Sequence, residues 1–161
     1  MSDLRLPARA SGAFGLAQRS QAGPRVEFLA FLLGGEPYAL PIGLILEILK
    51  PLPITEVPRA PKEVAGVMSV RGRLVTVFDL RQRFGLRIGE IERKARVLLV
   101  DGGEETVGLL VGEVLQVYRL AESQIEPPSV LGREPAPHIA GVGRHDELLF
   151  LLLDLRPILG F

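Results

Sequence analysis

The residues that could do chemistry in this chain are few. The two histidines, His138 and His145, lie in a Pro-rich loop and in an expected turn, and neither has a partner at the spacing of metal ligands. The chain has no cysteine, which excludes disulfides, thiol catalysis and Cys-based zinc sites. Ser69 and Ser123 lack the strand–turn–helix context of a nucleophilic serine. We therefore expect solvated loop histidines and predict neither a metal site nor a cofactor.

Two aspartates recur in one context, and paired carboxylates can do acid–base chemistry. Asp79-Leu80-Arg81 is followed by Gly85, and the same residue types return 75 positions later (154 − 79) as Asp154-Leu155-Arg156 and Gly160. No third functional group accompanies either copy. An aspartate before a short helix and a glycine after it are the usual cap and exit of that helix. We therefore predict that both aspartates are helix caps and that the chain is not an enzyme.

Arg71-Gly72 interrupts an apolar stretch, residues 66–78, that otherwise favours a β-hairpin. The second copy of this stretch, residues 141–153, has a polar turn at this point but no aligned Arg-Gly. Because only one copy carries the pair, the fold does not demand it. We therefore regard Arg71 as a candidate binding residue, with a solvated charge at a hairpin end as the alternative.

The elements that would position these residues are short β-strands. From residue 26 onwards, runs of branched and aromatic residues alternate with Gly-Gly, Pro and Arg-Gly turn signals. The Gly34-Gly35 and Gly102-Gly103 pairs are expected hairpin tips, 68 residues apart (102 − 34). A repeat of about 70 residues is too long for a solenoid and indicates two similar lobes. We predict an all-β fold with one small five-stranded barrel in each lobe, at about 26–86 and about 95–161.

Composition narrows the functional class. Hydrophobic residues make up 47% of the 161 residues, enough for a real core, and Lys plus Arg equal Asp plus Glu at 19 each. A neutral chain lacks the surplus of basic charge that nucleic acids and anionic membranes attract. No apolar run is longer than the six residues of 148–153, which is far too short for a membrane helix, and we expect no signal peptide before the strands. We expect a cytoplasmic protein with no nucleic acid partner and no direct membrane insertion.

Residues 1–25 differ from the rest of the chain. They carry four arginines against one aspartate and are rich in Ala, Gly and Ser, and Pro7, Gly12 and Gly15 interrupt any helical pattern. This composition favours a flexible basic tail. Binding of a partner, or an addressing role, is the alternative for this segment.

Three strings in order, VEFLAFLLGGEPYALPIGLILEILKP, ITEVPRAP and VAGVMSVRGRLVTVFDLRQRFG, resemble the CheW-like domain family. The resemblance covers residues 26–160, and its most specific part is P-x-x-P-x-x-V-x-G-V-x-x-x-R-G-x-x-x-x-V-x-D-L, which begins at Pro58. It implies two pseudo-symmetric five-stranded SH3-like β-barrels that share a hydrophobic core and carry short helical turns.

The resemblance also implies a non-catalytic adaptor within receptor arrays at the inner membrane. Family members join the tip of methyl-accepting chemotaxis receptors to the regulatory domain of a CheA-type histidine kinase. Carried over to this chain, Arg71 would contact the receptor and Glu47 would orient it. The further implied receptor contacts are Ile42, Ile45, Val97, Val107 and Gly108, and the implied kinase contacts are Leu49, Ile54, Val57 and Gly66.

These contacts have structural alternatives, namely core packing for the isoleucines and a backbone requirement for Gly66 and Gly72. The chain also departs from the family pattern, with Ser69-Val70 where many members have Asn-Leu, and with residues 111–114 reading Val-Gly-Glu-Val. The pathway therefore stays open between flagellar chemotaxis and the control of surface motility, pili or development. A competitor or accessory protein that binds only the receptor or only the kinase is the first alternative function, and a β-barrel enzyme is the second.

Overall fold

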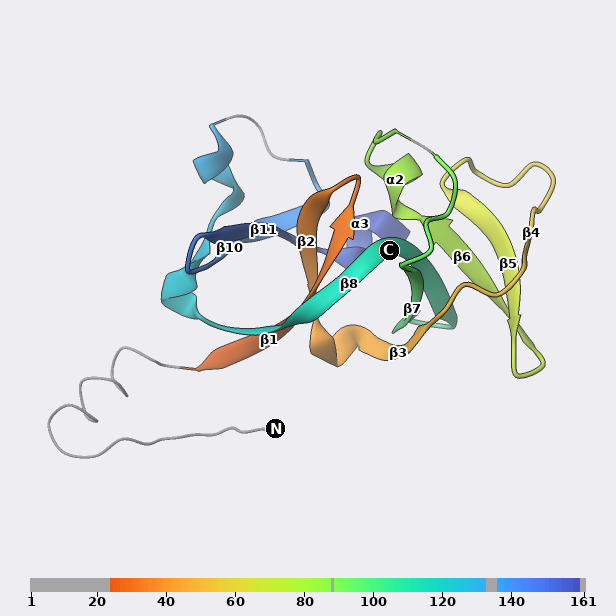
Figure 1. The fold of residues 1–161 in the computed structure, drawn as a ribbon, viewed down its shortest axis with the longest axis horizontal. Helices are drawn as coiled ribbons and strands as arrows, with labels where there is room; N and C mark the ends of the chain where they lie inside the picture. Colours follow the sequence, from red (N-terminus) through yellow and green to blue (C-terminus); the bar gives the residue numbers. More distant parts are fainter. Residues whose placement is uncertain (1–23, 88, 133–135, 160–161) are drawn as a thin grey trace, which may run out of the picture.

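A computed structural model describes residues 24–87, 89–132 and 136–159 (Figure 1). The predicted tail lies almost entirely outside these ranges, and so does Gly160, the predicted exit of the second helical turn. Within them the chain is mostly β, which confirms the predicted fold class.

In the described ranges, eleven strands form one continuous hydrogen-bonded network. They are β1 (Arg25–Leu33), β2 (Glu36–Pro41), β3 (Ile45–Leu49), β4 (Ile54–Thr55), β5 (Val64–Val70), β6 (Arg73–Asp79), β7 (Ala95–Asp101), β8 (Thr106–Ala121), β9 (Ile125–Glu126), β10 (Ile139–His145) and β11 (Leu148–Leu153). The helical elements are short: α2 (Leu80–Arg83), α3 (Leu155–Leu159), and the 3₁₀ turns η1 (Ile42–Leu44), η2 (Glu122–Gln124) and η3 (Pro128–Leu131).

The strands form two groups that share the long strand β8 (Figure 1). We call β3 to β7 with the first half of β8 the first barrel. We call β1, β2 and β9 to β11 with the second half of β8 the second barrel. β8 spans 16 residues and runs from one group to the other without a turn. Its first half pairs with β6 and β7, and its second half pairs with β1.

The strand pairing departs from the predicted lobes, which were contiguous in sequence. β1 and β2 belong to the first sequence copy, yet Phe28 lies opposite Tyr118 of β8 and Tyr38 lies opposite Leu151 of β11. Conversely, β7 of the second copy pairs with β3, with Val97 opposite Leu49. The hairpin β1–β2, which opens the first copy, thus belongs to the second barrel. The hairpin of β7 and the first half of β8, which opens the second copy, belongs to the first barrel. Residues 87–94 therefore separate the two sequence copies but not the two barrels. The prediction failed here because a local apolar pattern does not specify which distant strand will pair with a given strand.

The repeat itself is present in the structure. β6 is followed by α2 and pairs in parallel with β8, while β11 is followed by α3 and pairs in parallel with β2. The predicted hairpin tips are also in place, with positive φ angles of 58° at Gly34, 84° at Gly35 and 98° at Gly103. Glycine adopts these left-handed conformations without steric cost.

The two repeated aspartates are helix caps, as predicted. The Oδ1 atoms of Asp79 and Asp154 accept hydrogen bonds of 3.0 Å from the backbone N–H groups of Arg81 and Arg156. Each carboxylate also pairs with the guanidinium of the same arginine, at 2.9 Å in the first copy and 2.8 Å in the second. The hydrogen bonds from Arg156 lower the pKa of Asp154. Gly85 has a φ of 71° and supplies the predicted exit after α2.

One core cluster joins the two barrels. It combines buried residues of β1, β2, β7 and β8 with Leu80 of α2 and with Leu155 and Ile158 of α3. Smaller clusters fill the first barrel around Met68 and the second barrel around Phe150. Since the central cluster draws on both sequence copies, the barrels share a hydrophobic core, and neither has a complete core without the other.

His138 is not the solvated residue that the sequence predicted. Its ring stacks on Phe84 with centroids 4.1 Å apart and planes 7° apart, and its carbonyl accepts a hydrogen bond of 2.9 Å from the N–H of Asp154. Nearby, Arg83 donates a hydrogen bond of 3.0 Å to the carbonyl of Pro157. These contacts tie the end of α2 to the second copy. The side chain of His145 is 40% exposed and lies beside the ring of Tyr118.

We expect the His138 stack to make the protein less stable in mild acid. Burial lowers the pKa of His138 and the charge of Arg83 lowers it further, below the 6.5 of a free histidine. The unfolded chain therefore binds the proton more readily, so stability is fully present above the unfolded pKa and is lost as the pH falls through the folded pKa. His138→Phe keeps a stacked ring that does not titrate. Urea unfolding at about pH 7.5 and about pH 5 should show a smaller loss for this variant than for the wild type, and equal losses would contradict the prediction.

Candidate protein-binding site

The turn between β5 and β6 holds the most specific sequence signal, Arg71-Gly72. Val70 pairs with Arg73, which leaves a two-residue turn, and both turn residues have positive φ angles, 49° at Arg71 and 83° at Gly72. This is the conformation of a type I′ hairpin turn, which favours Asn-Gly. Arginine is rarely left-handed, because its Cβ approaches the following carbonyl.

The second copy shows that the fold does not require arginine at this turn. Asp146, 75 positions later (146 − 71), stands at the matching turn between β10 and β11 and has a φ of 55°. Aspartate tolerates the left-handed region better than arginine does. A residue held against its local preference at an exposed turn is a marker of function.

Glu47 of β3 receives the Arg71 guanidinium in a bidentate ion pair. Nη2 of Arg71 lies 2.5 Å from Oε1, and Nη1 lies 3.2 Å from Oε2. The contact that the family resemblance implied for these two residues is therefore present. The hydrogen bonds from Arg71 lower the pKa of Glu47, so the carboxylate stays charged well below neutral pH. The Arg71 side chain is still 68% exposed, and its remaining N–H groups can reach a partner.

The strand that carries Glu47 and the strand that follows the Arg71 turn each expose a large apolar side chain. Leu74 is 75% exposed and Leu46 is 59% exposed, the two highest values among the large apolar residues of the described ranges. Together they line a shallow depression of about 480 Å³, which the acidic tip between β7 and β8 closes on one side. An exposed apolar patch with a fixed charge beside it is typical of a protein-binding surface. Neither leucine was predicted as a binding residue, because an exposed and a buried leucine of an apolar strand look alike in sequence.

The predicted receptor contacts divide into surface and core residues. Ile42 of η1 is 36% exposed, and Ile45 is partly buried against the shared core. Val97, Val107 and Gly108 are buried, and they cannot touch a partner unless the barrel opens. A Cβ at Gly108 would lie 2.9 Å from Cγ1 of Val97, so this glycine serves packing inside the first barrel. We therefore assign Val97, Val107 and Gly108 to the core of the first barrel rather than to a direct contact with the receptor.

The predicted kinase contacts lie on β3, β4 and β5 of the first barrel and on the segment that follows β4. Ile54 belongs to β4, an edge strand of the network, and Val57 follows it with 43% exposure. Leu49 and Ile54 are partly buried and pack against the cluster around Met68. Gly66 is buried opposite β4, where a Cβ would lie 2.2 Å from the carbonyl oxygen of Thr55. Gly66 is therefore a packing residue, whereas Val57 and the β4 edge are open to a partner.

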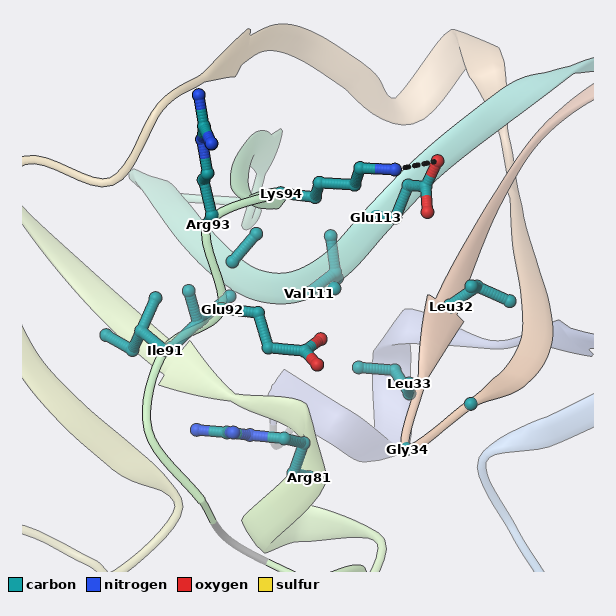
Figure 2. Close-up of a pocket in the computed structure, with 14 residues that line it drawn as sticks. Leu32, Leu33, Gly34, Arg81, Ile91, Glu92, Arg93, Lys94, Val111 and Glu113 are labelled. Atoms are coloured by element: carbon teal, nitrogen blue, oxygen red, sulfur yellow. Dashed lines mark ion pairs between the residues drawn. The ribbon is translucent and has the colours of Figure 1, made fainter.

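A second depression, of about 320 Å³, lies where β8 passes between the barrels (Figure 2). Leu33, Val111 and Ile91 give it apolar walls, and Lys94 and Glu113 form an ion pair of 3.7 Å at its rim. The lining holds no serine, histidine or cysteine that could act as a nucleophile or base.

In residues 24–87, 89–132 and 136–159, no group of three or more His, Asp or Glu side chains could hold a metal ion. None of the helices in these ranges has the length and apolar character to cross a membrane.

Comparison with known proteins agrees with this architecture. Residues 27–160 match the model of the CheW-like domain. The chain is 31% identical to the chemotaxis protein CheW of Helicobacter pylori over 134 residues, which cover 83% of this chain and 81% of the relative. It is 32% identical to CheW of Klebsiella aerogenes over 149 residues, which cover 90% of each chain.

Among solved structures, the scaffolding protein TtCheW from Thermoanaerobacter tengcongensis superposes with a TM-score of 0.76 at 27% identity. The match covers 82% of this chain and 90% of that one. The predicted family is thus confirmed by sequence and by fold. The chain belongs to the family of CheW-like domains, the coupling adaptors of chemotaxis signalling.

Proposed function

We propose that this chain couples the tip of a methyl-accepting chemotaxis receptor to the regulatory domain of a CheA-type histidine kinase. The observation that supports it best is the Arg71–Glu47 pair, which holds a charged, exposed guanidinium on a left-handed turn. The strand that carries Glu47 and the strand that follows Arg71 expose Leu46 and Leu74. We call Arg71, Glu47, Leu46, Leu74, Ile42 and Leu44 the receptor patch. A helical receptor tip offers polar groups to the guanidinium and apolar side chains to the leucines.

The kinase contact in this proposal uses the β4 edge. β4 pairs with β5 on one side only, because β4 ends the strand order, and Val57 lies exposed beside it. An edge strand offers unpaired backbone groups to another β-barrel, which suits a kinase domain of the same fold family. β4 pairs with Val67 and Met68 in the middle of β5, and Met68 stands three residues before Arg71 (71 − 68), so the β4 edge lies on the strand that leads into the Arg71 turn. The kinase domain would then pair along the outer side of β4, and the receptor would contact the turn between β5 and β6.

The test is a pull-down with the two partners as separate fragments, a receptor-tip hairpin and a kinase regulatory domain. Retention of each fragment alone, and of both together on the immobilised full chain, is the expected result. Binding of only one fragment would favour the alternative, a one-sided competitor or accessory protein. A chain that retains neither fragment would overturn the proposal.

A further inference from the structure

Three non-glycine residues of the described ranges have a positive φ angle, and two of them are arginines. They are Arg59 at 66°, Arg71 at 49° and Asp146 at 55°, and all three are exposed. Aspartate visits the left-handed region with its short polar side chain, whereas arginine is disfavoured there. Arg71 is held by its ion pair with Glu47, but no comparable contact holds Arg59 within these ranges.

Arg59 occupies the third position of a tight turn between β4 and β5. The N–H of Ala60 donates a hydrogen bond of 3.2 Å to the carbonyl of Val57, which closes a β-turn over Pro58 and Arg59. Proline fixes a negative φ at the second position, and a positive φ follows at Arg59, so the turn is of type II. The third position of a type II turn favours glycine or asparagine. The turn itself does not require arginine, which directs attention to the Arg59 side chain as a functional group.

The backbone around Arg59 is fixed on both sides. Pro61 restricts the residue before it to extended conformations, and a second turn follows at once, because the N–H of Val64 donates a hydrogen bond of 2.9 Å to the carbonyl of Pro61. The carbonyl of Glu63 accepts a hydrogen bond of 2.8 Å from the N–H of Asp79, which ties the end of the loop to β6. A contact made through Arg59 therefore orders one side chain and little backbone, which lowers its entropic cost.

The guanidinium of Arg59 is available beside the open β4 edge. No hydrogen bond or ion pair joins it to another residue of the described ranges, and the nearest acidic residues along the chain, Glu56 and Glu63, do not pair with it. Figure 1 shows the loop at the outer end of the first barrel, above β4 and β5. Arg59 follows Thr55, the last residue of β4, by four positions (59 − 55), so the two Cα atoms are at most about 14 Å apart. Val57, which lies between them, is 43% exposed.

We propose that Arg59 binds a carboxylate of the kinase regulatory domain and thereby selects the domain that pairs with β4. This inference deepens the proposed function and rests on its kinase contact. An incoming strand takes hydrogen bonds from the β4 backbone whatever its side chains are, so edge pairing alone does not distinguish one β-domain from another. The planar donor fork of a guanidinium matches a carboxylate and repels a basic side chain, which adds that distinction. Arg59 before β5 and Arg71 after it then serve one partner each.

The variant Arg59→Asn tests the contact in the full chain. Asparagine is favoured at this turn position, so the thermal midpoint should stay the same or rise. The affinity for the kinase regulatory fragment should fall about tenfold, while the affinity for the receptor tip should not change. The difference from the wild type should shrink when salt is raised from about 0.05 M to about 0.5 M, because salt weakens an exposed ion pair. Calorimetric titration with each fragment measures these affinities.

The matched control is Lys62→Gln, which removes a charge of the same sign from an exposed position of the same loop. Its affinity for the kinase fragment should fall about twofold or less. Equal losses in the two variants would indicate a general attraction by positive charge and would overturn the specific contact. Unchanged kinase binding by Arg59→Asn would overturn it as well.

A charge exchange tests the carboxylate directly. Arg59→Glu should bind the kinase fragment more weakly than Arg59→Asn, and a lysine in place of one exposed Asp or Glu of that fragment should restore the affinity. If no acidic position of the fragment gives this recovery, the carboxylate assignment is wrong. Wild-type chain that binds the fragment while Arg59→Asn binds it equally well removes only the role of Arg59. Wild-type chain that does not bind the fragment removes the proposed kinase contact itself, and the role of Arg59 with it.

Discussion

Replacing Gly66 with alanine is expected to lower the free energy of unfolding by about 3–4 kcal/mol. Gly66 has a φ of 149°, a region that residues with a Cβ rarely adopt. The new Cβ would lie 2.2 Å from the carbonyl oxygen of Thr55 and 2.8 Å from Cγ2 of Ile54. The oxygen belongs to the backbone, so no side-chain rotation relieves the clash. Relief requires β4 to move away from β5, and the cluster around Met68 would then lose the packing of Ile54.

The matched control for Gly66 is Gly35→Ala at the tip between β1 and β2. Gly35 also has a positive φ, 84°, but a Cβ there meets nothing within 4 Å. The free energy of unfolding of this variant should therefore fall by only about 1 kcal/mol, the cost of a left-handed backbone conformation at a residue with a Cβ. Urea unfolding measures both changes. Equal losses in the two variants would show that the contact with Thr55 does not matter, and Gly66 would return to the set of candidate kinase contacts.

Replacing Arg71 with asparagine should separate binding from stability. Asn-Gly is the favoured sequence of a type I′ turn, so the thermal midpoint should stay the same or rise. The exposed guanidinium is lost, and the affinity for the receptor tip should fall roughly tenfold or more, because a charged bidentate donor has no substitute at this turn. Thermal melting and titration with the receptor-tip fragment measure the two effects.

Two controls define the role of Arg71. Arg73→Asn removes a charge of the same sign from the same hairpin but leaves the pair with Glu47 intact, so receptor binding should change little. The exchange Glu47→Arg with Arg71→Glu restores an ion pair with the charges reversed. If Arg71 touches the receptor directly, this exchange does not restore binding. Full recovery would show instead that the pair only fixes the hairpin against β3.

Local signals in the sequence were sufficient for the turns and caps. Asp79 and Asp154 precede short helices and accept the expected backbone N–H groups, and Gly34-Gly35 forms a hairpin tip. These features depend on a few adjacent residues, so residue type and order predict them. The asymmetry at Arg71 was also visible in the sequence, because a repeat provides its own comparison for every position.

The partners of each strand could not be predicted in this way. An apolar strand pattern shows which side faces a core, but not which core or which neighbouring strand. The sequence suggested one barrel per copy, while the structure exchanges the first hairpins between the copies. The same limitation explains why Val97 and Gly108 were expected at a surface and lie inside the first barrel.

The sequence by itself determined the all-β class, the twofold repeat, the helix caps and the single Arg-Gly turn, since each follows from short-range chemistry or from comparison of the two copies. Only the tertiary structure decided that β8 joins two interleaved barrels and that His138 stacks on Phe84. It also placed Glu47 under the guanidinium of Arg71, 24 residues away along the chain. These contacts join residues distant in sequence, and their formation depends on how the whole chain packs rather than on any local preference.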